Sequence, residues 1–197
     1  MKLTVLDMGT GNLHSLGRAL LDCGATVEVE TDVRRCLDVE ALVLPGVGAF
    51  SPAAEALSPV RRELAQALLD GLPCLAICLG LQLLLTSSEE GAGEGLSVLP
   101  GRVERLHGRR VPHMGWNSLQ GADALLAAAG FSTAYYAHSY WCRLGDEHAV
   151  CATTQHEDQR FPALVRAART VGVQFHPEKS GRGGRRFLAE VLEEFQR

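Results

Sequence analysis

One cysteine, Cys78, constrains the fold of this chain most, because it lies where a strand-like run gives way to a helix-like run. Residues 74–77 are apolar and have the length of a buried strand, and residues 81–85 open a helix. A strand, a sharp turn and a helix with the nucleophile at the corner form a nucleophile elbow, which points helix amides at the thiol. A free cysteine is also commonly a small buried apolar residue. The elbow pattern by itself leaves both interpretations open.

Length and composition bound the possible classes of protein. The 197 residues fit one α/β domain spanning 1–197, and the net charge of -4 favours neither nucleic acid nor a membrane surface as partner. No apolar run has transmembrane length and the start, MKLTVLDMG, lacks a signal-peptide core, so we expect a cytoplasmic protein. The six cysteines form no C-x-x-C pair and no zinc-spaced cluster. We therefore expect reduced thiols, no metal and no cofactor.

The rest of the pattern alternates short apolar or β-branched runs with helical ones, which is typical of α/β proteins. We expect strands at 2–7, 26–30, 41–44, 74–77, 102–106, 116–119, 133–141, 149–154, 161–168 and 170–175, and helices at 13–23, 52–57, 60–70, 81–85, 122–129 and 184–196. The run 41–44 is apolar throughout, as in a parallel sheet that is covered on both faces. The sequence thus predicts a central, mostly parallel sheet flanked by helices.

Two glycine-containing loops follow strands of this predicted sheet. The first, residues 8–12, opens the run G-T-G-N-L-H at 9–14, which lacks the third glycine of the dinucleotide fingerprint, so nucleotide binding is disfavoured. The second, residues 45–50, is either a plain strand-to-helix connection or a turn whose glycines let the backbone approach a ligand. Both interpretations of the second loop can hold together.

A candidate base for the cysteine follows the last predicted strand. His176 and Glu178 flank Pro177, and in an extended chain residues i and i+2 point to the same face, so the carboxylate could orient the imidazole. Alternatively, H-P-E merely ends a strand and the glutamate is solvated. Since the elbow and this segment both follow parallel strands, they belong at the same edge of the sheet. The conjunction favours a Cys-His-Glu triad.

The remaining histidines and the Met/Trp segment have weaker context. We expect surface positions for four histidines, at 14, 107, 148 and 156, while His138 could line the same cleft but has no visible partner. Residues 111–117 put Met and Trp into a Pro/Gly loop. If exposed, these side chains indicate a contact surface, and if buried they belong to the core. Composition leaves this question open.

Two motifs, ICLGLQ at 77–82 and VQFHPE at 173–178, resemble the class I (triad) glutamine amidotransferases. Further segments resemble the glutaminase subunits of imidazole glycerol phosphate synthase, so that the resemblance covers essentially the whole chain: 7–13, 44–50, 112–117, 138–140 and 176–180. One departure is Ala76, where this family usually has glycine. Its methyl group would crowd the turn, and we expect it to be accommodated.

The resemblance implies a flavodoxin-like α/β fold that hydrolyses L-glutamine to glutamate and ammonia without a cofactor. Cys78 would attack the side-chain amide carbon, His176 would protonate the leaving ammonia and then activate water, and Glu178 would orient His176. The resemblance assigns oxyanion stabilisation to the amides of Leu79 and of the turn formed by Gly46, Val47 and Gly48. It assigns glutamine binding to Gln82, His138, Ser139 and Tyr140, with Gly46 beside them.

The resemblance also implies a partner, the (β/α)-barrel cyclase subunit, in a heterodimer through which ammonia passes to make imidazole glycerol phosphate and AICAR in histidine biosynthesis. The residues that match partner-facing segments are Asn12, Met114, Trp116, Asn117 and Lys179. Three alternatives stay open: a glutaminase serving another synthase, such as that of pyridoxal phosphate or anthranilate; a non-catalytic partner subunit; and a cysteine hydrolase of peptides or γ-glutamyl compounds.

Overall fold

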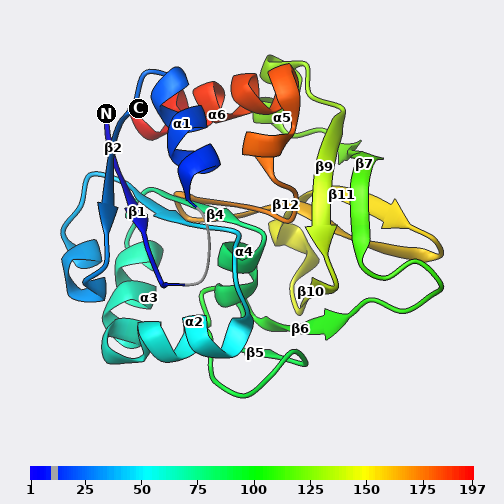
Figure 1. Ribbon diagram of the computed structural model, residues 1–197, viewed down its shortest axis with the longest axis horizontal. Coiled ribbons are helices and arrows are strands. Elements are labelled where there is room, and N and C mark those ends of the chain that lie inside the picture. The colour runs from blue at the N-terminus through cyan, green and yellow to red at the C-terminus, as the bar shows by residue number, and fades with distance from the viewer. Residues whose placement is uncertain (10–12) are drawn as a thin grey trace.

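A computed structural model describes residues 1–9 and 13–197, and its centre is an eight-stranded sheet (Figure 1). Asn12, predicted at the partner interface, lies outside the described residues. The strand order is β2-β1-β3-β4-β13-β12-β11-β8. The strands are β1 (Lys2–Leu6), β2 (Thr26–Glu30), β3 (Leu42–Leu44), β4 (Cys74–Ile77), β8 (Gln120–Gly121), β11 (Val150–His156), β12 (Gln159–Ala167) and β13 (Thr170–Val173).

The first five strands of this order are parallel, and the last three join antiparallel. The register pairs Leu44 with Ala76 and Ile77 with Val173, so β3, β4 and β13 end at the same edge. The prediction of a central, mostly parallel sheet flanked by helices is therefore confirmed. This edge collects the three segments on which the sequence analysis placed its candidate site.

Helices cover both faces of the sheet (Figure 1). On one face lie α1 (His14–Asp22), α5 (Ala124–Ala129) and α6 (Gly181–Phe195), and on the other lie α2 (Phe50–Leu57), α3 (Arg61–Leu69) and α4 (Leu79–Leu83). Short 3₁₀ turns occur at Val33–Leu37, Ser58–Val60, Glu147–Ala149 and Pro177–Lys179, and the last of these packs against α6 and α1. Among the described residues, no helix is long and apolar enough to cross a membrane.

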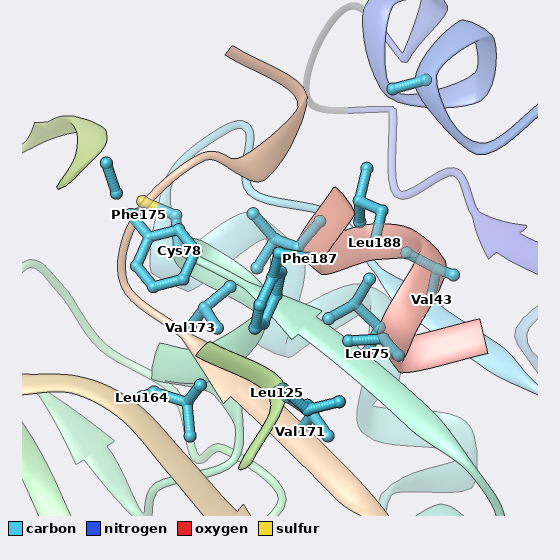
Figure 2. Close-up of a cluster of buried hydrophobic side chains, with 14 of the residues drawn as sticks. Val43, Leu75, Cys78, Leu125, Leu164, Val171, Val173, Phe175, Phe187 and Leu188 are labelled. Atoms are coloured by element: carbon cyan, nitrogen blue, oxygen red, sulfur yellow. The ribbon is translucent and has the colours of Figure 1, made fainter. Parts of the chain in front are cut away.

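The strand side chains alternate between two apolar clusters, which is why the central strands are apolar throughout. On β4, Leu75 and Ile77 belong to the cluster that includes Phe187 and Leu188 of α6, and Figure 2 shows Leu75 in this group. Cys74 and Ala76, the intervening residues, belong to the cluster on the opposite face. Burial on both faces fixes the register of β4, because a one-residue slip would exchange its two sets of side chains.

The region between residues 84 and 145 differs most from the prediction. The segment predicted as a Pro/Gly loop forms β7 (His113–Ser118), which pairs with β9 (Thr133–His138). The single strand predicted at 133–141 is two strands, because β10 (Tyr140–Leu144) joins a separate sheet with β6 (Gly101–Arg105) and β5 (Ser87–Ser88). The aromatic run continues through the break at Ser139, so composition gives no sign of it.

Candidate active site

Cys78 lies between β4 and α4 with φ 46° and ψ −98°, a backbone conformation that side chains rarely adopt. Its amide donates to the Val173 carbonyl at 2.7 Å, and its carbonyl accepts from the Gln82 amide at 3.1 Å. Such a conformation costs about 1–3 kcal/mol and persists only where the surroundings enforce it. Ala76 stays an ordinary, buried residue of β4, so the strain of the elbow falls on Cys78 and the extra methyl is accommodated.

The imidazole of His176 lies between the thiol and a carboxylate. His176 Nδ1 lies 2.8 Å from Glu178 Oε1, and both side chains are almost entirely buried. The i and i+2 argument from an extended chain is wrong in its geometry, because Glu178 belongs to the 3₁₀ turn Pro177–Lys179. The turn begins at the proline, whose fixed φ suits the first position of a helical turn, and it folds the carboxylate back to the ring.

Burial by itself lowers the pKa of His176, but the hydrogen bond and charge of Cys78, followed by those of Glu178, raise it to about 10. The ring therefore holds its proton through the neutral range. A protonated imidazole beside sulfur is suited to donate that proton to a leaving group.

The backbone of His176 is tied to β9, which holds the ring in place. The His176 amide donates to the Tyr135 carbonyl at 2.8 Å. The Ser180 hydroxyl donates to the His176 carbonyl at 2.6 Å and accepts from the Tyr135 amide at 2.9 Å. Ser180 is buried, so these bonds are shielded from water.

The sequence analysis missed Gln174 as a functional residue. Its side-chain Nε2 donates to Cys78 Sγ at 3.4 Å, and the residue is fully buried. The backbone amide of Gln174 donates to the Ala163 carbonyl, and this bond continues the pairing with β12 beyond the end of β13. The available signal was a single polar residue in the otherwise apolar run VGVQF at 171–175.

A cavity of about 420 Å³ opens beside the sulfur. Its lining contains Cys78 and His176 together with most of the other predicted site residues: Gly46, Val47, Gly48, Leu79, Gln82, Met114, His138, Ser139, Tyr140 and Lys179. Gly46 lies so close to the elbow that a Cβ there would be 2.9 Å from Cys78 Cβ and from the Ile77 carbonyl oxygen. Only glycine therefore lets this turn pass directly beside the nucleophile.

The alternation of β7 separates two sets of side chains. Met114 and Trp116 point outward with 65% and 59% of their surface exposed, so they belong to the surface rather than to the core. Met114 and exposed Lys179 also line the cavity, so this apolar surface reaches the cavity itself. Asn117, predicted with them at the partner interface, directs its amide to the His113 ring at 3.1 Å and to the Gln155 carbonyl at 2.8 Å, and its contact with a partner stays a prediction.

His138, for which the sequence showed no partner, is paired with His113. His113 Nδ1 lies 3.1 Å from His138 Nε2, and His138 Nδ1 lies 2.8 Å from the Tyr140 carbonyl oxygen. Burial lowers the pKa of His113 to about 4, with a contribution from His156, which was predicted at the surface and stacks on its ring. Burial lowers the pKa of His138 to about 3, with help from the other histidines, His176 included.

These two histidines predict a loss of stability in acid. Because their pKa values are lower in the folded chain, the unfolded chain binds more protons once the pH falls below about 6.5. The free energy of unfolding should fall by about 1.4 kcal/mol per pH unit for each proton, down to about pH 4 for His113 and about pH 3 for His138. Urea unfolding between pH 7 and 4.5 measures this slope. His113→Gln should make it shallower, and parallel curves for the two proteins would contradict the assignment.

Comparisons with known proteins agree with this geometry. Residues 4–194 match the family described as Glutamine amidotransferase class-I. The chain is 42% identical to the imidazole glycerol phosphate synthase subunit HisH of Natronomonas pharaonis, over 98% of this chain and 94% of that protein. It is also 42% identical to the same subunit of Pyrobaculum aerophilum, over 96% and 98%. A crystal structure of a glutamine amidotransferase superposes with a TM-score of 0.74 at 21% identity, covering 97% of this chain and 98% of the other, which confirms the fold.

Proposed function

The chain belongs to the class I glutamine amidotransferases, in the family of the imidazole glycerol phosphate synthase subunit HisH, and from this premise we propose that it hydrolyses glutamine to glutamate and ammonia with Cys78 as nucleophile. The observation that carries the proposal is that His176, whose ring is hydrogen-bonded to the Glu178 carboxylate, lines the same cavity as Cys78. A nucleophile, a base and an orienting group in this order are what acyl transfer requires.

In the proposed reaction the Cys78 sulfur attacks the side-chain amide carbon of glutamine, and a tetrahedral oxyanion forms. His176 passes its proton to the amide nitrogen, which leaves as ammonia, and a γ-glutamyl thioester remains on the sulfur. The neutral ring then takes a proton from water, which attacks the thioester, and glutamate is released as the thiol is restored. Glu178 keeps Nδ1 protonated and directs Nε2 at the reacting atoms.

The surroundings of the sulfur supply the other roles. Leu79 is the first residue of α4, where helix amides lack intrahelical acceptors, and its amide would bind the oxyanion together with an amide of the Val47–Gly48 turn. Gln82, His138, Ser139 and Tyr140 line the cavity and would hold the glutamine. Gln174 adds a donor that stabilises negative charge on the sulfur.

The ammonia is proposed to enter a (β/α)-barrel cyclase subunit and to be used there for imidazole glycerol phosphate and AICAR. The exposed side chains of Met114 and Trp116 support this, because apolar and aromatic side chains of this kind are enriched in protein interfaces. Lys179 extends the surface towards the cavity, and Asn12 stays a predicted contact. The six free cysteines fit the proposed cytoplasmic location, where thiols stay reduced.

Glutamate release measured with and without the barrel subunit and its nucleotide ligand tests this function. We expect release that depends strongly on the partner, on the hypothesis that the glycines at 46 and 48 make this turn flexible and that its amide is aimed at the oxyanion only in the complex. If the rate of glutamate release is the same with and without the barrel subunit, the chain is still a glutaminase, but the proposed role in histidine biosynthesis is wrong. If a folded complex with the barrel subunit releases no glutamate, the chain is a binding subunit that does not hydrolyse glutamine.

A further inference from the structure

A chain of hydrogen bonds runs from β7 through two buried histidines to the wall of the cavity. Asn117 Nδ2 lies 3.1 Å from His113 Nε2, and His113 Nδ1 lies 3.1 Å from His138 Nε2. His138 Nδ1 lies 2.8 Å from the Tyr140 carbonyl oxygen, which also accepts from Gln82 Nε2 at 3.0 Å. Both histidines are at least nine-tenths buried.

The atoms at the ends of the chain fix the direction of every bond in it. A carbonyl oxygen can only accept, so His138 Nδ1 carries the hydrogen, and Nε2 of the neutral ring must accept. His113 Nδ1 therefore donates, and its Nε2 accepts from the amide of Asn117. The other hydrogen of that amide has its own acceptor, the Gln155 carbonyl, and the Asn117 oxygen accepts from the Ser118 amide.

We propose that His113 is a positioning residue of the glutaminase site, since it fixes the ring of His138 and, through the Tyr140 carbonyl, the cavity wall behind the reacting sulfur. This inference rests on the proposed function. The Tyr140 carbonyl accepts from both His138 and Gln82, one at each lone pair, so the two side chains hold this oxygen together. A His138 ring that turned to donate through Nε2 would leave the Tyr140 carbonyl, and with it this part of the cavity wall, held by Gln82 alone.

The matched variants are His113→Gln and His113→Phe. A glutamine side chain keeps a donor and an acceptor about as far apart as the two ring nitrogens, so it can replace both bonds. A phenyl ring keeps the flat shape between Tyr136 and His156, which stack on His113 at 4.6 and 4.1 Å, but it leaves Nε2 of His138 without its donor. His148→Phe, at an exposed position, controls for the added phenyl ring.

Glutamine kinetics of the complex with the barrel subunit should show about a tenfold higher KM for His113→Phe, because a buried acceptor is left unsatisfied. We expect His113→Gln and His148→Phe to have the wild-type KM, and kcat to change less than KM. Equal KM values in all four proteins would overturn the proposal. Equal impairment of His113→Phe and His113→Gln would also overturn it, because it would assign His113 to packing alone.

Histidine ring ¹⁵N spectra of the full chain at neutral pH test the same chain of bonds without any turnover. We expect His113 and His138 to be neutral and protonated on Nδ1, the tautomer that free neutral histidine disfavours. His138 should keep this form in His113→Gln and lose it in His113→Phe. A wild-type His138 protonated on Nε2 would overturn the inference. A wild-type complex that shows the expected spectra but releases no glutamate would overturn only the proposed function.

Discussion

Cys78→Ala should lower glutamate release by a factor of about 10⁴ or more while the chain stays folded and still binds its barrel partner. The substitution removes the sulfur that would form the thioester, and no other cysteine is among the described residues that line the cavity. The side chain is small, so the loss of packing is small as well. Steady-state glutamate release by the complex measures the effect, and urea unfolding checks the fold.

The matched control is Cys74→Ala, four residues earlier in the same stretch. Burial raises the pKa of Cys74 to about 12, so its thiol is inert at neutral pH, and we expect its variant to keep its turnover. Cys78→Ser tests the demand for sulfur, because a hydroxyl in the same place is a far weaker nucleophile at neutral pH. Substantial glutamate release by Cys78→Ala would show that Cys78 is not the nucleophile.

Gly80→Ala should destabilise the chain by about 3 kcal/mol, or prevent folding, although it adds a single methyl group. A Cβ on residue 80 would run into the backbone carbonyl of Leu44 and would lie 2.8 Å from its Cβ. The obstacle is the backbone of β3, which cannot rotate away as a side chain can. Helix α4 and the elbow would therefore have to move off the sheet. The midpoint of urea unfolding measures the change, if the variant folds.

Gly17→Ala is the matched control for Gly80→Ala, because Gly17 also lies in a helix, α1, but nothing lies within 4 Å of its would-be Cβ. Alanine is the better helix former by up to about 1 kcal/mol, so this variant should be more stable than the wild type. If Gly80→Ala lowers the free energy of unfolding and Gly17→Ala raises it, then contact with β3, and not helix propensity, decides the effect at residue 80. Equal small effects would contradict the tight packing of α4 on β3.

The parts of the fold that the sequence predicted well depend on local patterns. The apolar run and the elbow that follows it predict a strand at 74–77, and the structure has a strand with the same first and last residues. The common edge of the elbow and the H-P-E segment follows from the parallel pairing of β4 with β13. The covalent order of the chain and the rule for parallel strands are sufficient for this inference.

The parts that were missed depend on contacts between distant segments. The break at Ser139 separates β9 from β10 because their partners, β7 and β6, lie in different sheets, and no local composition encodes that choice. His113 and His138 pair across β7 and β9, so His138 had no visible partner in the sequence. Gln174 acquires its role only because β13 carries it to the sulfur.

Labelling with a chloromethyl ketone analogue of glutamine would test most directly that Cys78 receives the glutamine side chain. Such a reagent enters the glutamine site and alkylates the nucleophile that it meets there. We predict one label per chain, found by peptide mass spectrometry on Cys78 alone, prevented by excess glutamine and absent from Cys78→Ala. A label on another cysteine, or labelling of Cys78 that glutamine does not slow, would contradict this site.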